Sequence, residues 1–107
     1  MNDSQIRAFL TIALMAALAD GGKDDREHAA LKSLAQRLGE GRIDLVDVYD
    51  DVLVRQLPIA DAVRSLTTPE TRRQAYETAV AVANADGVHS PAEGAFLRDL
   101  AAALGMP

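Results

Sequence analysis

The chain has 107 residues, enough for one domain with a sizeable hydrophobic core. It contains no Cys and no Trp, which excludes disulfides and thiolate metal sites and requires an aliphatic, alanine-rich core. The net charge of −5, with Lys and Arg scattered among acids, argues against a nucleic-acid surface. Cations or basic protein surfaces are the expected partners.

The first apolar segment, residues 8–19, is interpreted as a buried helix rather than a targeting segment. It ends in Ala17-Leu18-Ala19, which mimics a signal-peptide cleavage site, but the residues before it are only weakly basic. A similar segment precedes Asp86 in the middle of the chain. Because a membrane span needs roughly 18 to 20 apolar residues, we expect a soluble, cytoplasmic chain with no span of its own.

Two helices are predicted in the first 40 residues. Residues 4–19 are apolar on nearly all sides, so this helix is expected at the centre of the fold. Asp24 is a predicted N-cap with Glu27 three residues later, and Gly39 closes the second helix.

The next two predicted helices follow a loop over residues 39–44. Residues 45–53 have one apolar face and are stopped by Pro58, and a short helix follows over residues 59–66. The acids of the first of these helices have the spacing of a solvated outer face: Asp44, Asp47, Asp50 and Asp51.

The last two predicted helices both start at a proline. Thr68-Pro69-Glu70 begins a helix that runs to Ala85 and is again apolar on nearly all sides. Ser90-Pro91 begins the final helix, which ends at Gly105. With no competing strand pattern, the sequence predicts an all-α single domain over residues 1–107, a compact bundle of about six helices. The first and fifth helices should lie side by side at its centre.

An internal repeat marks the candidate site. Residues 19–39 return 66 positions later as residues 85–105, so that Asp20 matches Asp86 and Glu27 matches Glu93. The repeat predicts two pseudo-symmetric helical hairpins. Each has an Asp-Gly turn after an apolar helix and a glutamate at the start of the next helix.

Two interpretations of these four acids stay open. The aspartates fit Asx turns, with glycine supplying positive φ, and the glutamates fit capping boxes. Alternatively, a pseudo-two-fold axis brings all four carboxylates together, and a divalent cation then compensates their charge. His28 and His89 do not follow the repeat, so Ca²⁺, Mg²⁺ or Mn²⁺ suits the oxygen ligands better than Zn²⁺. No nucleophile is framed by a base or a nucleophile elbow, so we expect no enzymatic activity.

Residues 13–39 and 74–105 resemble the two signature hairpins of the TerB-like, tellurite-resistance-associated family of bacterial helical domains. The resemblance implies a helical bundle with pseudo-two-fold symmetry and divalent-cation binding at Asp20, Glu27, Asp86 and Glu93. It also implies a link to tellurite or stress resistance. Similar domains stand at the N-terminus of larger proteins with a hydrophobic second half, which implies attachment to the cytoplasmic face of a membrane through a longer parent chain.

Two functional hypotheses follow from these observations. The first is a non-enzymatic accessory domain whose duplicated acids bind a divalent cation. The second is a protein-interaction module with no metal, in which the acids are caps and turn formers and the acidic third helix docks an unidentified basic partner. The oligomeric state has no sequence signal.

Overall fold

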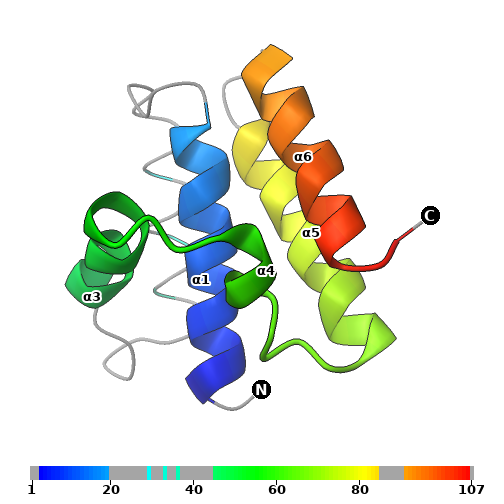
Figure 1. The fold of residues 1–107 in the computed structure, drawn as a ribbon, viewed down its shortest axis with the longest axis horizontal. Coiled ribbons are helices and arrows are strands. Elements are labelled where there is room, and N and C mark those ends of the chain that lie inside the picture. The colour runs from blue at the N-terminus through cyan, green and yellow to red at the C-terminus, as the bar shows by residue number, and fades with distance from the viewer. Residues whose placement is uncertain are drawn as a thin grey trace.

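Helices dominate the computed structural model, which describes residues 3–19, 29, 33, 36, 45–84 and 91–106 (Figure 1). Within these residues no strand occurs, and the predicted all-α class is confirmed. The elements are α1 (Asp3–Leu18), α3 (Leu45–Tyr49), the π-helical turn η1 (Asp50–Val54), α4 (Ile59–Ala62), α5 (Pro69–Ala83) and α6 (Pro91–Ala103).

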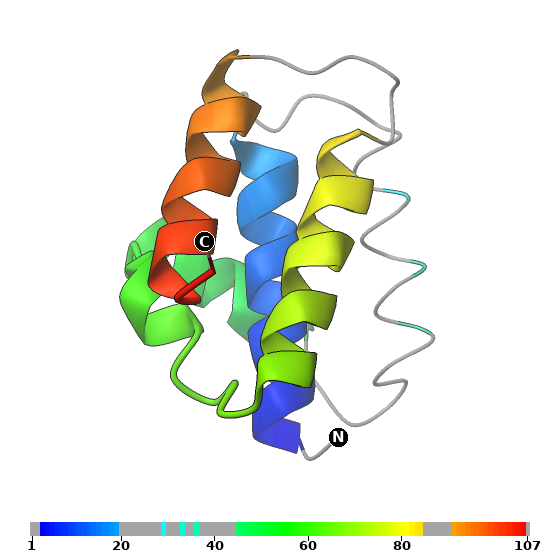
Figure 2. The ribbon, with the colours of Figure 1, turned by 90° about the vertical axis from the view of Figure 1, so that its right-hand side faces the viewer.

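Helix α1 is the centre of the fold, as its apolar composition predicts. It contacts α3, η1, α4, α5 and α6, and in Figure 2 it lies behind and between α5 and α6. An unbroken stretch from Ala8 to Ala17 is buried. Because small alanines let neighbouring helices approach closely while the larger residues fill the gaps between them, α1 can be covered on all sides. Its fully or almost fully buried large side chains are Phe9, Leu10, Ile12 and Leu14.

Helices α1 and α5 lie side by side and run in the same direction, which confirms their predicted adjacency (Figures 1 and 2). The prediction that α5 is apolar on nearly all sides is wrong. Helix α5 buries one face, made of Ala75, Ala79, Val82 and Ala83. The polar residues of its N-terminal half are spaced so that they occupy the opposite face, where Arg73, Gln74 and Glu77 are exposed.

Local capping signals fix two helix ends as predicted. The Thr68 hydroxyl accepts a 3.2 Å hydrogen bond from the Thr71 backbone N–H, with Pro69 at the first helical position of α5. Gly105, at φ 72°, ends α6: its N–H donates to the Ala102 carbonyl, and the Met106 N–H donates to the Ala101 carbonyl. This pair of bonds is a Schellman motif, which needs a residue with positive φ.

The segment after residue 45 differs from the regular helix predicted over residues 45–53. At Asp50 the α-helix widens into η1, where the Arg55 N–H donates to the Asp50 carbonyl five residues back. The predicted apolar face is only partly buried: Val48 is fully buried, whereas Leu53 is 55% exposed. Helix α4 ends at Ala62, short of the predicted Leu66.

The second predicted helix and both Asp-Gly turns lie outside the described residues, apart from Ala29, Ser33 and Gln36. These three are helical and exposed, and their spacing of four and three positions puts them on one face of a helix. The apolar stripe of that helix and the superposition of the two hairpins therefore stay predictions. In the part of the chain that the structure describes, no helix combines the length and hydropathy needed to cross a membrane.

Candidate functional site

Of the four predicted metal ligands, the structure describes one. Asp20, Glu27 and Asp86 lie outside the described residues. Glu93 lies in the first turn of α6 and is fully buried, which is unusual for a glutamate. The four-carboxylate site stays a prediction, and within the described residues no group of three or more His, Asp and Glu side chains is placed to hold a metal ion.

The helices around Glu93 share one end of the bundle. The C-terminal ends of α1 and α5 and the N-terminal end of α6 all lie there (Figures 1 and 2). Asp20 follows α1 by two residues and Asp86 follows α5 by three. The two described helices that precede the Asp-Gly segments in the sequence therefore both end where α6 begins.

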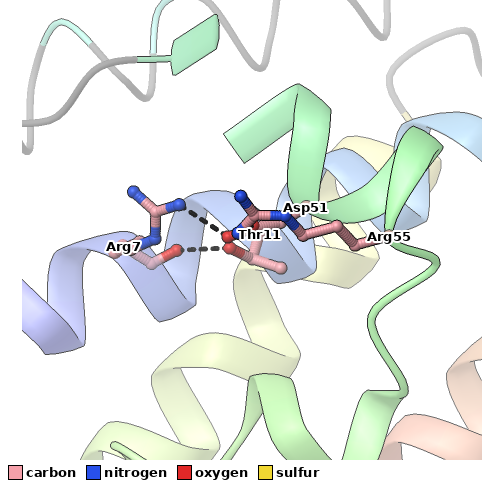
Figure 3. Close-up of polar contacts among 4 residues, drawn as sticks. All are labelled: Arg7, Thr11, Asp51 and Arg55. Atoms are coloured by element: carbon pink, nitrogen blue, oxygen red, sulfur yellow. Dashed lines mark hydrogen bonds and ion pairs between the residues drawn. The ribbon is translucent and has the colours of Figure 1, made fainter. Parts of the chain in front are cut away.

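A polar cluster that the sequence did not predict joins α1 to η1 (Figure 3). The Arg7 guanidinium donates to Asp51 Oδ2 at 2.5 Å, and Arg55 Nη1 donates to Asp51 Oδ1 at 3.0 Å. One turn along α1, the Thr11 hydroxyl donates to the Arg7 carbonyl at 2.8 Å. Asp51 thus accepts from two cations, one on α1 and one on the turn after η1.

The position of Asp51 corrects the prediction that it belongs to a solvated acidic face. Only 14% of its side chain is exposed, and it points toward α1, whereas Asp47 and Asp50 are exposed as predicted. The sequence signal for this contact is Arg7, the one charged residue after the first position of an otherwise uncharged helix α1.

The Arg7 hydrogen bond sets the ionisation of Asp51. It is the largest of the interactions that hold the pKa of this carboxyl below its usual value, and the charges of Arg7 and Arg55 act in the same direction. Partial burial opposes them, because it disfavours the charged form. Asp51 is therefore a carboxylate at neutral pH.

A hollow of about 170 Å³ lies beside this cluster, between α1, η1 and α4. Arg7 and Asp51 line it together with hydroxyl groups of Ser4, Thr11 and Ser65. Asp61 also lines the hollow, and its carboxylate pairs with Arg64. The charged groups of the lining are thus engaged in ion pairs, Arg7 with Asp51 and Asp61 with Arg64. The cluster is best explained as a clamp that fixes η1 on α1.

Replacing Asp51 tests this clamp. We expect Asp51→Asn to lower the free energy of unfolding by about 1 to 2 kcal/mol at pH 7, because two charge-assisted hydrogen bonds are lost in a partly buried place. Since the folded-state pKa lies below the unfolded value of about 3.9, the stabilisation is complete above that pH and is lost as the pH falls through the folded-state pKa. Urea unfolding of both proteins between pH 7 and pH 2.5 measures the difference.

Asp61→Asn is the matched control for that measurement. Asp61 pairs at 2.8 Å with Arg64, whose side chain is 80% exposed, so this substitution should cost less than about 1 kcal/mol. A loss for Asp51→Asn no larger than for Asp61→Asn, or one that does not fade in acid, would contradict the clamp.

Together these features define an all-helical domain built around one buried helix, with a carboxylate buried at one end. The chain belongs to the DUF533 family, whose profile, described as "Protein of unknown function (DUF533)", matches residues 2–107. Comparisons with curated proteins and with solved structures find no match.

Proposed function

We propose that this DUF533 domain is a non-enzymatic accessory domain of the TerB-like class that binds one divalent cation through Asp20, Glu27, Asp86 and Glu93. One observation carries the proposal: α1 and α5, the helices that lead into the two Asp-Gly turns, end beside the N-terminal turn of α6 that buries Glu93 (Figure 2). The described helix ends that precede Asp20 and Asp86 in the sequence therefore lie at the end of the bundle where α6 begins.

The ligand chemistry favours a hard cation. All four side chains are carboxylates, which suit Mg²⁺, Ca²⁺ and Mn²⁺, whereas Zn²⁺ sites usually contain nitrogen or sulfur. A buried carboxylate is stable only when opposite charge or hydrogen bonds compensate its lost hydration, and a cation would contribute such charge at Glu93. The donor set therefore fits the cation that the TerB-like resemblance implies.

The proposed setting is the cytoplasm, with attachment to a membrane through a longer parent chain and a role in tellurite or stress resistance. This setting rests on the TerB-like resemblance. It gives the domain an accessory task, in which cation occupancy stabilises one end of the bundle for a protein partner.

A thermal-shift titration with Mg²⁺, Ca²⁺, Mn²⁺ and Zn²⁺ tests the proposal. A cation that binds only the folded chain stabilises it by about 2.7 kcal/mol when its concentration is 100 times Kd, so the melting temperature should rise with concentration. Asp20→Asn combined with Asp86→Asn should abolish the rise. The control is Glu70→Gln combined with Glu77→Gln, which changes the net charge equally at exposed positions of α5. The absence of any rise at millimolar concentration, or an equal rise in both double variants, would refute cation binding at these acids.

A further inference from the structure

The surface formed by α3 and η1 combines exposed apolar residues with exposed acids. Val46, Leu53 and Val54 are 66%, 55% and 75% exposed, and they are the exposed large apolar residues of the described chain. Asp47 and Asp50 are exposed between them. We refer to these five residues as the α3–η1 face.

Exposure, not regular helix spacing, defines this face, because the widened turn at Asp50 interrupts the α-helical period. All five residues are exposed to solvent within nine consecutive positions. Val48, fully buried, lies on the opposite side. Scattered apolar residues on a surface need no explanation, but exposed apolar residues gathered on one short segment are typical of a docking surface.

The Arg7–Asp51 clamp fixes this face toward solvent. Asp51 Oδ2 lies 2.5 Å from the Arg7 guanidinium on α1, and Val48 is buried in the core. Because these two residues hold one side of the segment against the rest of the fold, the other side stays exposed to solvent. The face is therefore a preformed surface, which lowers the entropic cost of binding a partner.

The charge of the α3–η1 face indicates which kind of partner it can bind. The five residues of the α3–η1 face carry the two negative charges of Asp47 and Asp50 and no positive charge. Beside the face, Arg7 and Arg55 share the single negative charge of Asp51, so that cluster keeps one positive charge. Nucleic acid and anionic lipid surfaces would meet these carboxylates with like charge. A second copy of this face is disfavoured too, because it would bring four carboxylates into one interface and no basic residue of the face to pair with them.

We propose that the α3–η1 face docks a basic amphipathic helix of a partner protein. Leu53 and Val54 would pack between apolar residues of that helix, and Asp47 and Asp50 would pair with Lys or Arg beside its apolar stripe. This inference is independent of the cation site, because the α3–η1 face contains none of the four acids proposed to bind the ion.

The test uses the full chain and a synthetic peptide of about 18 residues, with Leu at i, i+3, i+4 and i+7 and Lys at the remaining positions. Isothermal titration calorimetry at low ionic strength should show one-to-one binding that weakens as salt is added. Leu53→Ser combined with Val54→Ser should weaken binding by about tenfold or more, because the apolar anchors are lost. Asp47→Asn combined with Asp50→Asn should weaken it by about fivefold or more. Circular dichroism checks that each variant keeps its helices.

Glu70→Gln combined with Glu77→Gln is the matched control, because it makes the same change in net charge at exposed acids of α5. Unchanged peptide binding in this control, with the losses above, supports the proposal. Equal losses in the two charge variants would show attraction by net charge alone and overturn it. It would also be overturned if the peptide did not bind, if a peptide with Glu in place of Lys bound equally well, or if sedimentation showed a dimer that Leu53→Ser with Val54→Ser dissociates.

Discussion

Leu14→Ala should lower the free energy of unfolding by about 3 to 5 kcal/mol, the cost expected when a large side chain is removed from a well-packed core. Leu14 lies in the middle of α1 and is fully buried. Helix α1 contacts each of the other described helices, so the residues around Leu14 are held by several elements. They cannot all move to fill the cavity that the substitution leaves. Urea unfolding followed by circular dichroism measures the loss.

Leu53→Ala is the matched control, since it makes the same chemical change at a leucine that is 55% exposed. We expect it to change the free energy of unfolding by less than about 0.5 kcal/mol. Comparable losses at the two positions would show that Leu53 is part of the core, as its sequence spacing predicts, and that the exposed α3–η1 face does not exist. If Leu14→Ala lowered the free energy of unfolding only slightly, this would contradict the central position of α1.

Local chemistry explains which features of the fold were predictable. Thr68 and Pro69 start a helix through the geometry of a few neighbouring residues, and Gly105 ends one through its positive φ. The central place of α1 is a stronger inference from composition, because a helix that is apolar on all sides is costly in water wherever it is not covered. Helix α5 shares the alanines but not the uncharged composition, and for that reason it is buried on one face only.

The burial of Asp51 depends on a contact that periodicity does not contain. Asp51 and Arg7 are 44 positions apart, and their ion pair forms only when η1 packs on α1. A spacing argument assumes regular α-helix geometry, so it places Asp51 with Asp47 and Asp50 on the solvated side and Leu53 with Val48 on the buried side. In the structure Asp51 pairs with Arg7 and Leu53 is exposed, so tertiary packing overrides both assignments.

The candidate cation site also combines features that local sequence predicts with features that depend on tertiary packing. Repeat spacing identifies equivalent acids, and Pro91 places Glu93 in the first turn of α6. Burial of Glu93 is a tertiary property, because it depends on which helices cover that turn. That the other three acids bind a cation together with Glu93 stays a prediction, which the cation titration tests.

Glu93→Ala should lower the free energy of unfolding by about 2 to 4 kcal/mol in the absence of metal. The substitution leaves a cavity where a fully buried side chain was, and it removes a negative charge from the N-terminal turn of α6. Glu70→Ala is the control: Glu70 is an exposed acid in the first turn of α5, so its loss should cost about 0.3 to 1 kcal/mol through the helix dipole alone. Urea unfolding of both variants in chelator measures this part.

Repeating the unfolding with millimolar Mg²⁺ or Mn²⁺ separates the two functions of Glu93. If Glu93 binds the cation, the difference in the free energy of unfolding between the unsubstituted chain and Glu93→Ala should increase when metal is added. The reason is that only the unsubstituted chain gains the binding free energy. A gap of equal size in chelator and in metal would assign Glu93 to helix capping and core packing, and the interaction module without a metal would then be the better description of the domain. A gap in chelator no larger than for Glu70→Ala would contradict the burial of Glu93 itself.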